Sequence, residues 1–318
     1  GNGDARGRAS ARIDRRLNMA RPALAASRAV SVLTLMTTHP AQVFTLSDLA
    51  ERLGVNYASM HAVMSVLEQA GFVRRHPSHK TYELGPAAIA LGHAALDRNP
   101  YIDVARDEMR RLAGELDLEL LLVARVGDEM VAVAKAGRAM GSWVNMRVGQ
   151  RISLKPPLGL AFVAWDADEE LERWLAKAGP DVTPDELAHY RRVVAAVRRQ
   201  GYSVGLEGYE RARLGGLLSI SDGEATITAG VGTSSSVQSA IDALAHAAYH
   251  VEQIDEGKAY DVAVLNAPVF DALGRPLLLI SMAGYRRPLM AEEVRAFGNR
   301  LRAAGARVTS VVQGHAPR

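Results

Sequence analysis

The sequence predicts an α+β protein with a small helical N-terminal domain and a larger C-terminal domain built around one antiparallel sheet. Two short runs with helical apolar periodicity meet at Gly54-Val55-Asn56 and are followed by a short strand pair. Further along, pairs of apolar strands are flanked by helical patterns, which is typical of an α+β domain. At 318 residues, the chain is long enough for two domains that each have a core.

Composition limits the classes of protein to which the chain can belong. No run of about eighteen apolar residues occurs and no charged-then-apolar leader opens the chain, so we expect a cytoplasmic protein without a membrane span. The absence of cysteine excludes disulfides, thiolate metal sites and a cysteine nucleophile. Residues 1–96 hold eleven Lys or Arg against six Asp or Glu, whereas the remainder holds 27 against 29. This asymmetry favours a nucleic-acid-binding N-terminal domain, with a chance fluctuation of a few charges as the alternative.

The N-terminal domain is predicted over residues 23–86. Residues 1–22, which precede it, are rich in Arg, Gly and Ala without an apolar period, and we expect them to form a flexible basic tail. Ser27 is predicted to cap the first helix, whose apolar face extends to Met36 and which Pro40 ends.

Two short helices are predicted next. Thr45 or Ser47 begins the first of them and Gly54 stops it, while Asn56 caps the second, which ends at Gly71. The side chains expected to be buried recur at helical spacing: Leu46, Leu49, Ala50, Leu53, Met60, Val63, Met64 and Leu67.

The following segment, "FVRRHPSHKTYELG", predicts a strand, a polar turn containing proline, and a second strand. Helix, helix, turn, helix and hairpin is the order of a winged helix. Ala50 is small enough for two helices to cross closely, Gly54 permits the tight turn, and Met60 fills the crossing, which is the pattern of a helix-turn-helix. A purely structural helix pair that contacts no DNA is the alternative.

In a helix-turn-helix, the first turn of the second helix enters the major groove, where Asn and Ser side chains bind base edges. Basic side chains on the wing lie along the phosphate backbone and mainly add affinity. The predicted DNA-binding residues are Asn56, Tyr57, Ser59 and His61 on the helix, and Arg74, Arg75, His76, His79 and Lys80 on the wing.

A hydrophobic helix, "AAIALGHAALDRN", is predicted within residues 87–100 and is suited to link domains or to dimerise. The C-terminal domain is predicted over residues 101–318. Its expected elements are a helix over 102–116, a hairpin over 118–137 that bends at Gly127-Asp128, helices over 168–177 and 184–199, a hairpin over 263–284, and a last helix from Ala291 to about Ala304.

Taken together, these segments resemble transcription regulators of the IclR family, named for the regulator of isocitrate lyase. The resemblance covers roughly residues 24–312, and 33 arginines against 5 lysines give it an actinobacterial look. It implies a winged-helix domain, a linker helix and a GAF-like effector-binding domain, acting as a homodimer or a dimer of dimers on double-stranded DNA. The matching segments are "SRAVSVL", "LSDLAERLGV", "HAVMSVLEQAGFV", "TYELGPAAIALG", "VGQRISLKPPLGLAFVAW", "YRRVVAAVRRQGYSV" and "LNAPVFDALGRPLLLISMAG".

The chain departs from the family pattern in three places. Tyr57 and Ala62 replace the Lys and Arg that are common in the family's recognition helix. Pro156-Pro157 replaces a small polar pair in the pocket loop, which stiffens the loop. An insertion of about fifty residues, 208–258, stands where the family has a short link. We expect this insertion to be a flexible loop, with a lid or a protein-contact surface as alternatives.

The resemblance implies an effector pocket between the sheet and the loop that leads to "GLAFVAW". Most of the matching residues are apolar, and a few polar groups among them would orient a small molecule. No arginine is among them to bind a carboxylate, so an aromatic or more apolar metabolite is favoured over the organic acids that relatives often bind. The expected residues are Trp143, Asn145, Met146, Leu158, Gly159, Leu160, Asn266, Ala267, Ser281 and Met282.

The sequence offers little for catalysis, cofactors or metals. No Ser lies in a G-x-S-x-G elbow, and the glycine-rich "GVGTSSS" lacks the lysine of a phosphate-binding loop. His246 and His250 are four residues apart on a predicted helix, but no third metal ligand is evident. We therefore expect a ligand-responsive DNA-binding regulator that is not an enzyme and has no cofactor. An effector-fold enzyme and an architectural or co-regulatory protein are the alternatives.

Overall fold

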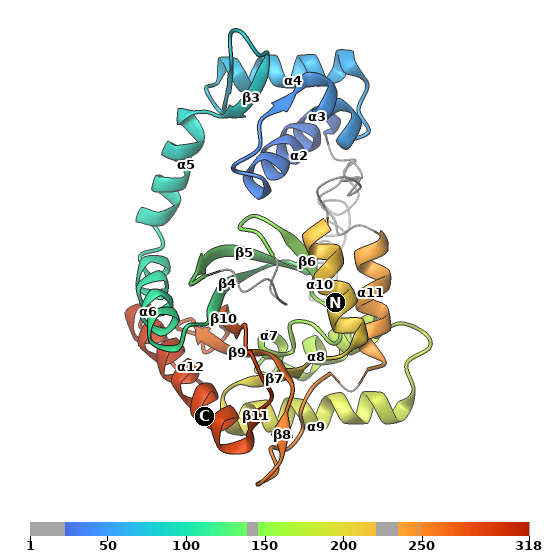
Figure 1. Cartoon of the computed structure of the whole chain (residues 1–318), viewed down its shortest axis with the longest axis vertical. Coiled ribbons are helices and arrows are strands. Elements are labelled where there is room, and N and C mark those ends of the chain that lie inside the picture. The colour runs from blue at the N-terminus through green and yellow to red at the C-terminus, as the bar shows by residue number, and fades with distance from the viewer. Residues whose placement is uncertain (1–22, 139–145, 221–234, 248, 318) are drawn as a thin grey trace, which may run out of the picture.

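The computed structural model describes residues 23–138, 146–220, 235–247 and 249–317. Two globular parts are joined by an extended helical connection (Figure 1). We call residues 23–85 the head and residues 101–317 the body. In the described ranges, no helix has the length and the apolar run needed to cross a membrane.

The head holds three helices and a small antiparallel sheet, in the predicted order. Its first helix starts one turn before Ser27, since alanine and leucine upstream favour helix, and Ala23 occupies the N-cap. The predicted cap at Ser27 is therefore wrong. The elements are α2 (Leu24–Thr38), β1 (Phe44–Thr45), α3 (Leu46–Arg52), α4 (Tyr57–Gln69), β2 (Val73–Arg75) and β3 (Thr81–Leu84), with strand order β1-β3-β2.

Side-chain caps fix the break between α3 and α4. Thr45 and Asp48 form a reciprocal capping box at the start of α3, which selects Thr45 over Ser47 as the cap. Asn56 caps α4, and Gly54 adopts a positive φ of 59° between the two helices. Fifteen buried side chains from all six elements form the core of the head, and they include all eight that the sequence predicts.

The linker helix α5 (Pro86–Asp97) has no buried residue. Its large apolar side chains Ile89 and Leu91 are 64% and 60% exposed. The helix runs down one side of the molecule from the head to α6 (Tyr101–Leu116) (Figure 1). Such an apolar and uncovered helix is what the sequence pattern predicts for a segment that links or dimerises.

The body is built on a six-stranded antiparallel sheet with the strand order β6-β5-β4-β10-β9-β7. Both predicted hairpins form its centre, and the first bends at Gly127-Asp128 as expected. The strands are β4 (Glu119–Val126), β5 (Glu129–Ala136), β6 (Arg151–Ser153), β7 (Ser203–Leu206), β9 (Val262–Phe270) and β10 (Pro276–Ala283), and a separate pair is formed by β8 (Ala259–Tyr260) and β11 (Leu289–Met290).

Helices cover both faces of this sheet. On one face, α6 and α12 (Ala291–Val311) pack over Leu120, Leu122 and the other side chains that point the same way. The last helix is two turns longer than predicted because Leu301, Ala304 and Val308 continue its buried face. The other face carries α7 (Leu160–Val163), α8 (Asp168–Leu175), the 3-10 helix η1 (Ala176–Ala178), α9 (Pro184–Gln200) and two helices from the insertion, α10 (Tyr209–Ile220) and α11 (Ser235–Ala245).

Two segments of residues 208–258, α10 and α11, are helical and packed, in contrast to the predicted flexible loop. Leu214 on α10 and Ile241 on α11 belong to the core of the body. Lys155 forms an ion pair with Asp242, and Ser153 donates a hydrogen bond of 3.1 Å to Gln238. Burial of these apolar faces holds α10 and α11 against the edge of the sheet (Figure 1).

Candidate functional site

The exposed surface of the head includes the start of α4. Tyr57 is 58% exposed, and His61, one turn later, is exposed as well. Ser59 is half-buried and lines a groove with Val63 and residues of α2, so it points to one side of that surface. The side-chain oxygen of Asn56 accepts a 2.9 Å hydrogen bond from the backbone N–H of Ser59. Two of the four predicted side chains, Tyr57 and His61, therefore project freely from the first turns of α4.

The wing is formed by β2, β3 and the turn between them. Arg74 is engaged across the strands with Glu83, at 2.9 Å from its Nε and 2.5 Å from its Nη2. The guanidinium of Arg75 lies 5.8 Å from the centre of the Tyr82 ring. Lys80 and His79 are exposed at the turn, where Lys80 adopts a positive φ of 55°. The wing thus presents a basic edge that is ordered by local contacts.

The body contains a cavity of about 100 Å³ between the sheet, the loop 154–160 and the insertion helix α10. We call the loop 154–160 the pocket loop. Gly159 is required there, because its φ is 75° and a Cβ would collide with the side chain of Leu154. The cavity is lined by Leu121, Val123, Met130, Met146, Ile152, Pro157, Leu158, Gly159, Leu160, Ala161, Ser203, Arg211, Leu214, Leu218, Tyr249, His250, Val264, Asn266, Leu279 and Ser281.

Six of the ten residues predicted for the effector pocket line this cavity, namely Met146, Leu158, Gly159, Leu160, Asn266 and Ser281. Ala267 and Met282 do not. They follow Asn266 and Ser281 in β9 and β10, and successive strand residues point to opposite faces of a sheet. Both are fully buried against the α6 and α12 side. Trp143 and Asn145 lie outside the described residues.

A row of polar side chains crosses three strands at the floor of the cavity. Ser281 on β10 donates a 2.7 Å hydrogen bond to Oδ1 of Asn266 on β9. Nδ2 of Asn266 in turn donates to Oγ of Ser203 on β7 at 3.1 Å. Ser203 was not predicted as a pocket residue. It lies beside Asn266 because β7 pairs with β9 in a register that places these two residues opposite each other. The row leaves a small polar surface within otherwise apolar walls.

The insertion contributes a cation to the cavity, contrary to the expectation that no arginine lies there. The side chain of Arg211 on α10 is 6% exposed. Burial raises the pKa of the Tyr249 phenol, and the charge of Arg211 and a hydrogen bond from it offset part of that rise. Burial also raises the pKa of the Glu207 carboxyl, and the Arg211 charge opposes that effect. Arg211 was not predicted, because it reaches the cavity only through the packing of α10 on the sheet.

His250 is a neutral wall of the cavity. Burial lowers its pKa from 6.5 to about 4. Its Nε2 lies 2.7 Å from the Pro157 carbonyl oxygen, so this nitrogen carries the proton and donates to the pocket loop. The predicted helical pairing with His246 is wrong, since α11 ends at Ala245 and His246 instead contacts Glu186 at 3.0 Å. The described ranges contain no cluster of three or more His, Asp or Glu suited to a metal.

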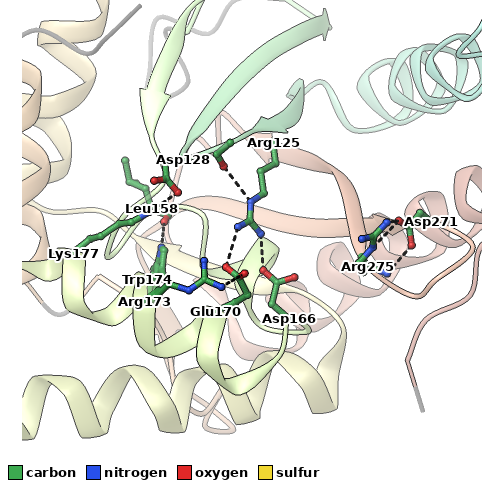
Figure 2. A network of polar contacts seen from close by, with 11 residues as sticks. Arg125, Asp128, Leu158, Asp166, Glu170, Arg173, Trp174, Lys177, Asp271 and Arg275 are labelled. Atoms are coloured by element: carbon green, nitrogen blue, oxygen red, sulfur yellow. Dashed lines mark hydrogen bonds and ion pairs between the residues drawn. The ribbon is translucent and has the colours of Figure 1, made fainter. Parts of the chain in front are cut away.

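A polar network anchors the pocket loop from behind (Figure 2). Nε1 of Trp174 donates a 3.1 Å hydrogen bond to the carbonyl oxygen of Leu158. Nearby, Lys177 binds Asp128 at 2.7 Å and Arg125 binds Asp166 at 2.6 Å, which ties η1 and the segment before α8 to the β4–β5 hairpin. Trp174 and His250 each contact a carbonyl oxygen of the pocket loop, and these two contacts hold this wall of the cavity in place.

Comparisons with known proteins agree with this architecture. Residues 25–77 match the IclR helix-turn-helix domain, and residues 93–238 match the bacterial transcriptional regulator IclR C-terminal domain. The chain is 26% identical over 196 residues to the HTH-type transcriptional regulator KipR of Bacillus subtilis. This alignment covers 58% of this chain and 76% of KipR. It is 28% identical over 195 residues to the glycerol operon regulatory protein of Streptomyces coelicolor, over 59% and 75% of the two chains.

Solved structures show the same fold. An IclR transcriptional regulator from Alicyclobacillus acidocaldarius superimposes with a TM-score of 0.60 at 23% identity, over 91% of this chain and 98% of that one. An IclR homolog from Microbacterium hydrocarbonoxydans, solved in complex with 4-hydroxybenzoate, gives a TM-score of 0.56 at 18% identity, over 91% and 99%. The first match lies within the head, and the second covers the end of the linker helix and the body up to residue 238. The chain belongs to the IclR family, whose members are ligand-responsive DNA-binding transcription regulators.

Proposed function

We propose that the chain acts as a homodimer on an operator of two related half-sites, and that a small, largely apolar carboxylate in the cavity of the body controls its occupancy of that operator. One observation carries the proposal: the chain that has a complete winged helix-turn-helix also encloses an apolar cavity with a buried arginine. The uncovered apolar surface of α5 supports self-association through the linker.

On DNA, α4 would enter the major groove and the wing would follow the backbone. Tyr57 and His61 are placed to contact base edges or phosphates, while Asn56 keeps its side-chain NH₂ group for a base. Ser59 lies at the side of the same surface. Arg74, Arg75, His79 and Lys80 would supply sequence-independent contacts. A dimer presents two such surfaces, which matches a pseudo-palindromic operator.

The walls of the cavity define the chemical class of the effector. Its lining is mostly aliphatic, which favours an apolar body. Arg211 would bind an acidic group through charge-assisted hydrogen bonds, and burying a cation is most favourable when an anion accompanies it. The arginine favours an acid, whereas the sequence alone favours an aromatic or more apolar metabolite over an organic acid. The 4-hydroxybenzoate bound to the Microbacterium homolog supports a single-ring or smaller acid.

The polar groups of the cavity suit binding rather than catalysis. His250 is neutral and donates to the protein's own backbone, and Ser281 and Asn266 hydrogen-bond within the sheet. We therefore propose a regulator without catalytic activity. Because its partner is operator DNA, we propose that it acts in the cytoplasm.

Matched ligand pairs test this function. Monocarboxylic acids of increasing size, from propionate to benzoate, are each compared with the corresponding primary amide by the shift in the unfolding temperature of the intact protein. We expect acids to stabilise the protein and amides to do so less, because an acid brings a negative charge to Arg211 and the corresponding amide does not. Equal stabilisation by acids and amides, or stabilisation by neither, would contradict the proposed effector class.

A further inference from the structure

The head touches the body at a short turn beside the cavity. Nη1 of Arg147 lies 2.8 Å from Nε2 of His39, the residue that ends α2. We infer that the turn 147–150 transmits the state of the effector cavity to the DNA-binding head. This inference rests on the proposed function, since it describes how that cavity would control the head.

The geometry at His39 defines the contact. Nδ1 of His39 lies 2.9 Å from the carbonyl oxygen of Leu35, which makes Nδ1 the protonated nitrogen. Nε2 is therefore the unprotonated nitrogen and accepts a hydrogen bond from the Arg147 guanidinium. The His39 ring also packs edge-on against Phe44, a fully buried residue of the head core, with ring centres 6.2 Å apart. Through His39, Arg147 is thus coupled to the core of the head.

Gly149 provides a second point of contact. Its φ is 87°, and a Cβ at this position would lie 2.7 Å from Cγ2 of Thr37 on α2. The backbone of the turn therefore packs directly against the end of α2, at a distance that only glycine permits. Any rotation of the turn would change both the polar contact at His39 and the packing at Thr37.

On the body side, Gln150 holds the turn to the insertion helix. Its Oε1 accepts a 2.9 Å hydrogen bond from the backbone N–H of Arg147, and its Nε2 donates to the carbonyl oxygen of Leu218 at 3.5 Å. Leu218 lies near the end of α10 and lines the cavity. Met146 and Ile152, on either side of the turn, line the cavity as well. Gln150 thus connects Arg147, which contacts the head, with α10, which lines the cavity.

Among these walls, α10 is the one that a ligand would displace. The cavity of about 100 Å³ is smaller than the roughly 150 Å³ that holds benzene in a well-studied engineered cavity, so a ring acid must move a wall. The sheet is bonded on every strand, and the pocket loop is held by Trp174 and His250. Movement of α10 would carry Leu218 with it, and through Gln150 would shift Arg147. A ligand that favours one position of α10 thereby favours one position of the head.

The absence of cysteine allows a direct test without any ligand. Exposed Glu51 on α3 and Arg199 on α9 are replaced by cysteine and spin-labelled, and the distance distribution between them is measured by pulsed electron paramagnetic resonance. Labelled chains are diluted into an excess of unlabelled chains, so that the measured distance is the one between the two labels of the same chain. We expect one narrow distribution for the labelled parent protein.

Contact variants are then compared in this labelled background. Arg147→Ala and His39→Ala are each expected to broaden the distribution at least twofold, and the double variant to broaden it no further. Gln150→Leu touches no atom of the head yet is expected to do the same, while Arg147→Lys, which keeps a donor, restores part of the narrow peak. Arg192→Ala, which removes a surface ion pair with Glu252 on the body, is the control and should leave the distribution unchanged. A Gln150→Leu distribution identical to the control would overturn the inference.

A cavity variant tests the step from the pocket to the turn. Leu214→Phe enlarges a side chain of α10 that faces the cavity, and should shift the mean distance in the labelled parent but not in the Gln150→Leu background. Equal shifts in both backgrounds, or none in either, would exclude the turn as the connection. Circular dichroism confirms that each variant is folded. These distance measurements use neither operator DNA nor an acid. A protein that binds no operator and no acid would therefore refute the proposed function, while the distance measurements alone decide whether the turn 147–150 couples the cavity to the head.

Discussion

The side-chain oxygen of Asn56 lies 2.9 Å from the backbone nitrogen of Ser59 and closes the first turn of α4. The residue at the entrance to the recognition helix is therefore a structural cap as well as a candidate base contact. Its oxygen is occupied by the cap, which leaves only the NH₂ group to donate to a base acceptor. These two roles can be separated by substitutions that keep one of them.

Asn56→Ala is expected to lower both stability and operator affinity. Loss of the cap should reduce the free energy of unfolding by about 1 kcal/mol, and loss of the base contact should weaken operator binding by roughly 1–3 kcal/mol. Asn56→Asp keeps the cap oxygen but places a negative charge beside DNA. It should therefore retain stability while losing affinity. Urea unfolding and operator titration by fluorescence anisotropy distinguish the roles, and Asn56→Asp with unchanged affinity would place the base contacts elsewhere.

Lys80→Gly is expected to weaken DNA binding to all sequences alike. Lys80 has a positive φ, so glycine keeps the turn of the wing while removing the charge. If Lys80 neutralises one phosphate, the slope of log K against log salt concentration should decrease in magnitude by about 0.9. Operator and random duplex are titrated between low and moderate salt. A loss confined to the operator would mean that Lys80 contacts a base, and an unchanged slope would remove the wing from the interface.

Arg211→Met is expected to abolish the preference for acids over amides. Methionine fills similar space without charge, so only the charge-assisted contact is lost, worth about 1.5–3 kcal/mol or roughly 10- to 150-fold in affinity. Affinity for the corresponding amide should stay within a few-fold. Arg199→Met, on the exposed face of α9, is the matched control. Calorimetric titration with benzoate and benzamide measures both constants, and an acid affinity that survives in Arg211→Met would assign the anion to another group.

His250 should make the body less stable in mild acid. Its pKa is about 4 in the folded state against 6.5 when unperturbed, so between these values the unfolded chain binds more protons and stability falls as pH decreases. From pH 7 to pH 5 this group should contribute a loss of about 2 kcal/mol. His250→Gln keeps an N–H donor near the Pro157 carbonyl but does not titrate. Urea unfolding of both proteins at each pH isolates the effect, and equal pH dependence would mean that His250 is not buried as a neutral group.

Local patterns predicted much of the fold. The caps Thr45 and Asn56, the turn at Gly54 and the bend at Gly127-Asp128 follow from residues that are neighbours in sequence. The ends of helices were predicted less accurately. The helix α12 continues to Val311 because its last turns pack against the body, and no local sequence signal indicates this packing. The core residues of α3 and α4 were predicted because helical periodicity separates their buried and exposed faces. In α2 the predicted face was wrong, since Val30 is exposed and Val32 and Leu35 are buried instead.

The candidate site was predicted only in part, for physical reasons. Asn266 and Ser281 line the cavity, whereas their neighbours Ala267 and Met282 face the opposite layer, because a strand alternates its side chains. Arg211 reaches the cavity through the packing of α10 on the sheet, which the local sequence pattern does not report. The proposed preference for acids and the contact at Arg147 both depend on tertiary placement, which sequence periodicity does not report.

Capture of sheared genomic DNA from the source organism by the purified protein, sequenced at low and at moderate salt, tests the central claim most directly. A sequence-specific regulator should recover a few sharp peaks at both salt concentrations that share a pseudo-palindrome with two related half-sites, and Asn56→Asp should lose those peaks. Diffuse recovery that disappears with salt and contains no shared motif would contradict the claim, because it would leave only a basic surface without sequence recognition.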